Sequence, residues 1–111
     1  MSKRSFSLLI DDIIDSGQKI LQYTKDLTFE DFISDSKTID AVVRNFEIIG
    51  EAANHLPDEF KDKYPDIDWH RIRGLRNRIV HDYFGIDFNI IWKIRETFLP
   101  EIISKIQSIR S

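Results

Sequence analysis

Residues 36–55 read SKTIDAVVRNFEIIGEAANH. Apolar residues recur in this stretch at intervals of three and four, which is the spacing of one face of an α-helix. The apolar stripe consists of Ile39, Val42, Val43, Phe46, Ile49, Gly50 and Ala53. We therefore predict a helix that Ser36 opens and that runs to about His55.

Gly50 lies within this apolar stripe. A glycine inside a helix costs about 1 kcal/mol relative to alanine. Because glycine has no side chain, it also allows another backbone to come unusually close. We expect a neighbouring helix to pack directly against residue 50.

Apolar periodicity also predicts a helix before this stretch, from about Phe6 to Lys25. Thr28 is followed by Glu30 and Asp31, an arrangement typical of an N-cap with acidic residues in the first turn. We therefore expect a short helical turn from Phe29 to Ser34.

Two further helices are predicted after residues 36–55. Asp68 can cap a helix from Trp69 to near His81, and Asp87 can cap a helix from Phe88 to about Ser108. Pro100 removes one main-chain hydrogen bond within the last of these helices. We expect a kink at that point rather than the end of the helix.

Length and composition are those of one compact helical domain. The chain has 111 residues, of which 41% are hydrophobic, and it contains no cysteine. Disulfides and thiolate metal sites are therefore excluded. No apolar run approaches the ~20 residues that a membrane-spanning helix needs. We expect a single domain over residues 1–111, an all-α antiparallel bundle of four main helices in a soluble, cytoplasmic protein.

Basic residues are concentrated in one short segment. Residues 69–81, WHRIRGLRNRIVH, contain four arginines and no acidic residue. The other 12 Lys and Arg residues stand against all 19 acidic residues, so the segment carries +4 and the rest of the chain −7. A basic stripe on an acidic body indicates a local anion site, and a solvated helix face is the plainer alternative.

Arg76 lies among apolar positions when this segment is drawn as a helix with about 100° per residue. The residues within about 60° of it are Trp69, Ile72, Ile79, Val80 and Tyr83. A buried guanidinium without a partner is costly, so Arg76 must meet an acid, a phosphate or a groove open to water. The structural alternative is an ion pair with Glu47 or Glu51.

Arg73, Asn77 and His81 form a second line along the same helix, four residues apart. His81 falls about 140° from Arg76, so two copies of the helix facing each other would bring both residues to one cleft more easily than a single copy. An arginine can stabilise a phosphate in its transition state, and a histidine can transfer protons near neutral pH. These residue types suit RNA cleavage without a metal ion, with Asn77 and Arg73 positioning the phosphate.

The segment RNRIVHDY, residues 76–83, resembles the Arg-x4-His-x-Tyr motif of the HepT-like toxins, which are members of the HEPN superfamily of helical ribonucleases. The lead-in WHRIRGLRN is similar too, and RNFEIIGEAA, residues 44–53, resembles the family's Arg-x-x-x-Ile-Ile-Gly-Glu-Ala stretch. The similarity extends over essentially the whole chain in length and order of elements.

This resemblance implies a type VII toxin–antitoxin ribonuclease that works as a homodimer, without a cofactor or metal. Arg76 and His81 would be the catalytic residues. Tyr83 would be the residue that a minimal nucleotidyltransferase antitoxin modifies with AMP. Added bulk and negative charge there would exclude and repel an RNA strand.

Two other interpretations fit the same residues. The chain can be a non-catalytic helical module that binds nucleotide or docks a nucleotidyltransferase. It can also be a purely structural helical dimer, in which Arg76 could be replaced by leucine without loss of function.

Overall fold

In this computed structural model, residues 5–84 and 87–110 are described, with the side chains of residues 80–84 and 110 outside the description. The described residues form helices joined by turns and no strand, so the predicted all-α class is confirmed. None of the described helices combines the length and apolar character needed to cross a membrane. The elements are α1 (Phe6–Tyr23), α2 (Phe29–Ile33), α3 (Ser36–His55), α4 (Asp58–Lys61), α5 (Trp69–Phe84), α6 (Phe88–Lys93), the π-helix η1 (Ile94–Phe98) and α7 (Leu99–Arg110).

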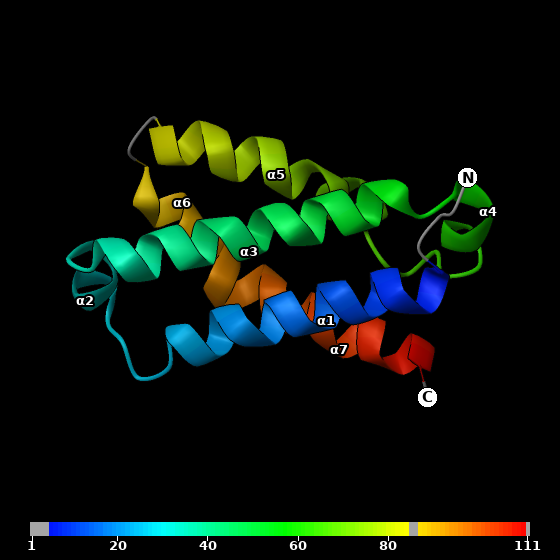
Figure 1. The fold of residues 1–111 in the computed structure, drawn as a ribbon, viewed down its shortest axis with the longest axis horizontal. Helices are drawn as coiled ribbons and strands as arrows, with labels where there is room; N and C mark the ends of the chain where they lie inside the picture. The colour runs from blue at the N-terminus through cyan, green and yellow to red at the C-terminus, as the bar shows by residue number, and fades with distance from the viewer. Residues whose placement is uncertain (1–4, 85–86, 111) are drawn as a thin grey trace.

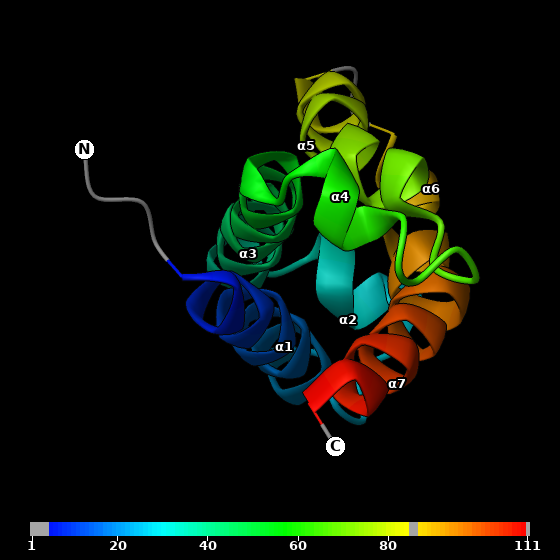
Figure 2. The same ribbon diagram turned by 90° about the vertical axis from the view of Figure 1, so that its right-hand side faces the viewer.

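Helix α3 lies between α1 and α5 and packs extensively against both (Figure 1). Helix α7 runs beside α1, and α6 lies beside α5. Viewed from the end, α1, α3, α5, α6 and α7 surround a common interior, while the short α4 crosses in front of it (Figure 2). The predicted helices are therefore present, and α3 is the element that connects α1 to the basic helix α5.

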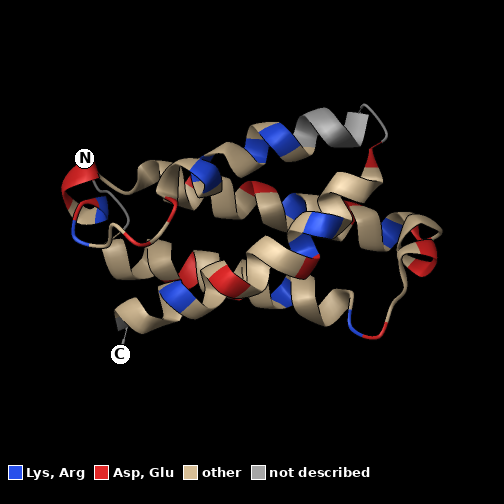
Figure 3. Cartoon of the chain, turned by 180° about the vertical axis from the view of Figure 1, so that it is seen from behind, with Lys and Arg blue, Asp and Glu red and all other residues tan. Residues whose placement is uncertain are grey.

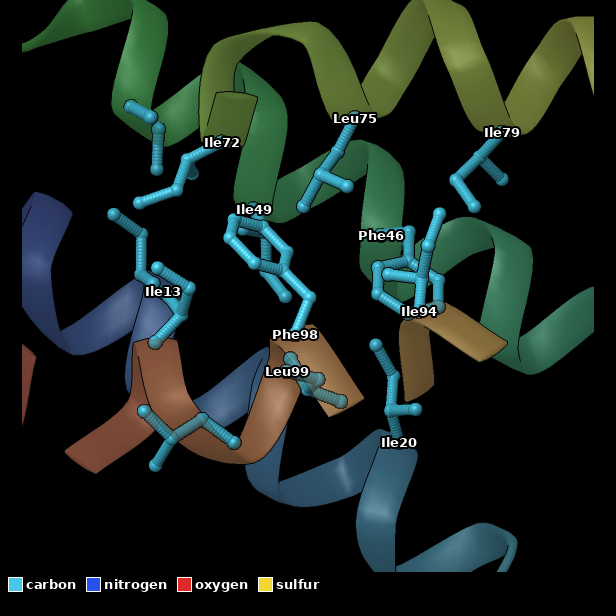
Figure 4. Close-up of a cluster of buried hydrophobic side chains, with 14 of the residues drawn as sticks. Ile13, Ile20, Phe46, Ile49, Ile72, Leu75, Ile79, Ile94, Phe98 and Leu99 are labelled. Carbon is cyan, nitrogen blue, oxygen red and sulfur yellow. The ribbon is translucent and has the colours of Figure 1, made fainter. Parts of the chain in front are cut away.

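The interior is filled by aliphatic and aromatic side chains from all the long helices (Figure 4). From α3, Val42, Phe46, Ile49 and Ala53 are fully buried, which confirms the stripe read from the sequence. They meet Ile13 and Ile20 of α1, Ile72, Leu75 and Ile79 of α5, and Ile94, Phe98 and Leu99 of the last helical stretch.

Polar side chains mark where three of the helices begin. In α2, the Thr28 hydroxyl accepts from the Asp31 N–H and the Asp31 carboxylate accepts from the Thr28 N–H, so both members of a capping box are present. Asp68 caps α5 as predicted, because its Oδ1 accepts from the Arg71 N–H at 3.0 Å. Helix α3 begins at Ser36 as predicted, and its cap is the residue before it.

The N-cap of α3 is Asp35, and Ser36 is the first helical residue. The Asp35 carboxylate accepts hydrogen bonds from the main-chain N–H groups of Lys37 and Thr38 and from the Thr38 hydroxyl. The bond from that hydroxyl is the main cause that lowers the pKa of the Asp35 carboxyl. A carboxylate is favoured over a serine hydroxyl at this place because it accepts several donors at once and carries the charge that a helix N-terminus attracts.

The last predicted helix is interrupted before Pro100. Residues Ile94–Phe98 form a π-helix, and the Leu99 N–H bonds to the carbonyl of Ile94, five residues back. Proline at position 100 cannot donate the next main-chain bond, and the wider turn re-spaces the backbone just before it. Within this turn, Arg95 donates from Nε to the Thr24 hydroxyl at 2.7 Å and from Nη2 to the Thr24 carbonyl at 3.3 Å, which ties η1 to the end of α1.

At Gly50 the backbone of α3 comes close to that of α5. A Cβ atom built on Gly50 would lie 3.0 Å from the main-chain nitrogen and 3.0 Å from the Cβ of Arg76. The expected close backbone approach is therefore present, and its partner is Arg76 itself. In contrast, a Cβ on Gly74 of α5 would meet nothing within 4 Å.

These two glycines predict opposite effects of the same substitution. Gly50→Ala should lower the free energy of unfolding by about 1–2 kcal/mol, because the added methyl meets helix backbone that cannot turn aside. Gly74→Ala should raise it by about 1 kcal/mol through helix propensity alone. Urea denaturation of the two variants measures both changes, and a Gly50→Ala protein as stable as Gly74→Ala would show that the α3–α5 contact is loose.

Candidate functional site

Helix α5 separates its apolar and basic residues onto different faces. Trp69, Ile72, Leu75 and Ile79 are buried against the core. The four arginines, Arg71, Arg73, Arg76 and Arg78, are exposed, and they appear as a series of basic positions along α5 in Figure 3. The described part of α5 carries no acidic side chain among them.

Arg76 lies at the edge of the apolar face. Its side chain is 50% exposed, so the interpretation that placed it at the middle of the apolar arc is wrong in position. Leu75 is the reason, because it is buried about 100° to one side of Arg76 and moves the centre of the arc away from it. Arg76 thus stays at the surface, where α3 and α5 meet.

An acidic partner for Arg76 comes from α3. The Arg76 Nε lies 3.1 Å from Oε1 of Glu51, and Arg76 Nη1 donates to Oδ1 of Asn77 at 3.5 Å. The ion pair foreseen for Arg76 is therefore present, with Glu51 as the partner. Since Glu51 directly follows Gly50, the close approach at Gly50 also brings this carboxylate within reach of Arg76.

A surface pocket of about 280 Å³ opens beside this ion pair, between α3 and α5. It is lined by Gly50, Glu51 and Asn54 of α3 and by His70, Arg73, Gly74, Arg76 and Asn77 of α5. Three of the residues predicted for the site, Arg73, Arg76 and Asn77, therefore share one pocket. The two glycines leave backbone at its walls without a side chain in front of it.

The pocket also contains residues that the sequence did not single out for it. His70 of α5 is exposed and lines the pocket. Asn54 of α3 also lines the pocket, and the sequence did not identify it as a site residue. The signal for Asn54 is its place four residues after Gly50, because α3 residues at that spacing share a face.

His81 and Tyr83, the remaining predicted site residues, belong to α5 by their backbone, and their side chains lie outside the described part of the chain. The helix was expected to end near His81, whereas it continues to Phe84. Positions 76 and 81 are therefore on one uninterrupted helix, about 140° apart around its axis.

Arg71 and Arg95 show what an arginine with a structural role looks like in this protein. The guanidinium carbon of Arg71 lies 3.9 Å from the centre of the Phe98 ring, and that of Arg95 lies 4.9 Å from the centre of the Trp92 ring. Such contacts hold the cation against the core. Arg76 instead pairs with a half-exposed carboxylate, an interaction worth about 0–1 kcal/mol, which an incoming phosphate can replace with a bidentate contact.

The described parts of the chain contain no set of side chains arranged to bind a metal ion. Across residues 5–84 and 87–110, no three His, Asp or Glu side chains come together in a group that could hold a metal ion. The chemistry available in the pocket comes from guanidinium, amide, imidazole and carboxylate groups.

Comparison with known proteins gives a consistent result. A family model described as Ribonuclease HepT-like matches residues 13–109. A Methanocaldococcus jannaschii protein named as a candidate RNase is 39% identical over 109 residues, covering 98% of this chain and 90% of the relative. A Thermococcus cleftensis protein named as a candidate ribonuclease HepT is 37% identical over 108 residues, covering 97% of this chain and 98% of the relative. No solved structure matches the chain.

The exposed Arg76–Glu51 pair predicts small effects on stability. Arg76→Gln and Glu51→Gln should each change the free energy of unfolding by less than about 1 kcal/mol, because water already solvates both partners. Ile72→Ala, at a fully buried position of the same helix, should cost about 2–5 kcal/mol and serves as the positive control. Chemical denaturation checks all three, and a loss of several kcal/mol in Arg76→Gln would favour a structural role for this arginine.

Proposed function

This chain belongs to the HepT-like ribonuclease family, and from that premise we propose that it is a toxin endoribonuclease that cuts RNA without a metal ion. The observation that carries the proposal is the pocket between α3 and α5, where Arg73, Arg76 and Asn77 meet beside a displaceable carboxylate. A guanidinium in such a place binds a phosphodiester and stabilises the charge that develops on its oxygens.

In the proposed reaction, the 2′-oxygen of a ribose attacks the adjacent phosphorus and the 5′-oxygen of the next nucleotide leaves. His81 takes the proton from the 2′-hydroxyl, or gives one to the leaving oxygen, as a general base or acid. Arg76 holds the phosphate through this step, with Asn77 and Arg73 positioning it. The products are a 2′,3′-cyclic phosphate and a 5′-hydroxyl end.

A homodimer supplies the geometry that one chain lacks. Because α5 continues past position 81, Arg76 and His81 start from positions about 140° apart on a regular helix. Two helical bundles related by a two-fold axis, with their α5 helices facing each other, would place an arginine from one copy near a histidine from the other. We include this dimer in the proposal.

Regulation by a nucleotidyltransferase antitoxin is the second part of the proposal. Tyr83 follows His81 by two residues in α5 and occupies the tyrosine position of the family motif. Addition of AMP to its phenol would bring a phosphate and a nucleoside close to the catalytic histidine. The added negative charge would then repel the RNA backbone.

The Glu51 carboxylate favours one alternative function. Because it already neutralises Arg76, the pocket can also belong to a non-catalytic module that binds a nucleotide or docks a nucleotidyltransferase. Cleavage by the purified protein distinguishes the two functions.

The ribonuclease proposal predicts RNA cleavage that persists in EDTA and yields 2′,3′-cyclic phosphate ends. Arg76→Ala and His81→Ala should each lower the rate by at least about 100-fold, the usual contribution of a general acid–base or transition-state group. Arg71→Ala removes an arginine from the same helix but outside the pocket, and it should retain most of the activity. Cleavage of a labelled RNA measures these rates. Activity that survives both site substitutions, or that EDTA abolishes, contradicts the mechanism.

The regulatory proposal predicts a gain in intact mass of one or more AMP units when the protein is incubated with ATP and a cognate minimal nucleotidyltransferase. Tyr83→Phe should prevent this gain because it removes the accepting hydroxyl. Tyr23→Phe, at an exposed tyrosine of α1, is the control and should be modified like the unaltered protein. If Tyr83→Phe is still modified, the acceptor lies elsewhere.

A further inference from the structure

A second pocket lies beside the proposed catalytic one. It has a volume of about 340 Å³ and opens at the first turn of α5, where the α4 region packs. His70 and Arg73 line both pockets, so the two are neighbours along α5. The side chain that distinguishes the second pocket is Lys61, the last residue of α4.

The side chain of Lys61 is mostly buried, while its ammonium group has no protein partner in the described structure and remains in contact with solvent. Only 8% of the residue is exposed, and among the described residues no hydrogen bond or ion pair reaches its ammonium group. Burial, followed by the nearby Arg73 guanidinium, lowers the pKa of Lys61, and Asp58 opposes the effect. A lysine that buries its stem and keeps its ammonium group in water can offer that charge to a ligand anion.

The surrounding carboxylates do not pair with this ammonium group. Asp58 and Asp62 also line the pocket, yet neither carboxylate lies within ion-pair distance of Lys61 or Arg73 in the described part of the chain. Arg73 itself forms no ion pair there. Two cations therefore share one pocket, with the exposed imidazole of His70 beside them.

We propose that Lys61, Arg73 and His70 bind a second phosphate of the RNA strand, next to the phosphate held at Arg76. This inference rests on the proposed function for the identity of the ligand as RNA. Arg73, which lines both pockets, is placed to contact the strand between the two phosphates. Lys61 then binds RNA in the ground state and takes no part in proton transfer.

The test uses a non-cleavable probe, a short fluorescein-labelled 2′-O-methyl oligouridylate, whose binding to the full chain is followed by anisotropy across a series of salt concentrations. Lys61→Gln should weaken binding about tenfold at low salt and lower the slope of log Kd against log salt by about 0.7, the contribution of one contact to a single strand. Lys63→Gln makes the same charge change two residues away, at an exposed position outside the pocket. It should leave both quantities within about twofold of the unaltered protein.

Thermal unfolding separates binding from a structural role. Lys61→Met should unfold at the same or a higher temperature than the unaltered protein, because it keeps the buried part of the side chain and removes a charge that no protein group pairs with in the described residues. A clear decrease in melting temperature would assign Lys61 to the fold and overturn the proposal. Arg73→Gln, at an exposed position, should weaken binding of the probe and reduce the salt dependence of that binding, as Lys61→Gln does.

Three outcomes distinguish this site from the proposed function. If Lys61→Gln binds the probe as Lys63→Gln does while Arg76-dependent cleavage is observed, the second phosphate site is wrong and the ribonuclease stands. If binding of the probe depends on Lys61 but no RNA is cleaved, the second phosphate site is supported and the proposed ribonuclease activity is wrong. If inorganic phosphate stabilises the protein only when Lys61 is present, and Lys61→Gln leaves binding of the probe unchanged, the pocket binds a free anion. The assignment to RNA is then overturned.

Discussion

The missing side chain at Gly50 determines how closely α3 and α5 can lie, and the proposed site depends on that distance. Gly50 accepts the backbone of Arg76 at a separation that a methyl group would fill. This contact places Glu51 next to the Arg76 guanidinium and leaves a pocket between the two helices. The close contact at Gly50 therefore positions the arginine, its carboxylate partner and the pocket beside them.

The arginines of this protein are held in two different ways. Arg71 and Arg95 lie over aromatic rings, and Arg95 also donates two hydrogen bonds to Thr24. Such contacts hold these two side chains in place against the surface of the core. Arg76 has one exposed ionic partner, and Arg73 has none among the described residues. Arg73 and Arg76, which line the pocket, therefore make fewer contacts within the fold than Arg71 and Arg95 do. This is expected where a ligand supplies the missing contacts.

Much of the fold follows from periodicity, because each long helix carries a continuous apolar stripe. The ends of α3 and the close contact at Gly50 could be predicted in this way, since both depend on local pattern. The Asp35 cap and the π-helix could not, because they depend on which of several competing local hydrogen bonds forms. The candidate site could be predicted from the sequence only in part, for a related reason. Arg73, Arg76 and Asn77 share a helix, whereas the contributions of Asn54 and Lys61 depend on how separate elements meet.

The π-helix at Ile94–Phe98 has a consequence for how the end of the chain tolerates changes in length. A wider turn accommodates one residue more than an α-helix would in the same span, so the apolar faces of α6 and α7 stay on the same side of the helix despite the extra residue. Ile91 before it and Ile102 and Ile106 after it all reach the core. Deleting one residue from this turn would restore a uniform α-helix over the same span and leave α7 facing as it does now, whereas a regular α-helix that kept every residue would rotate everything after the turn by about 100°. That rotation would turn the isoleucines of α7 toward solvent, so the loss of one residue is better tolerated here than in a regular helix, although no side chain of the turn belongs to the proposed site.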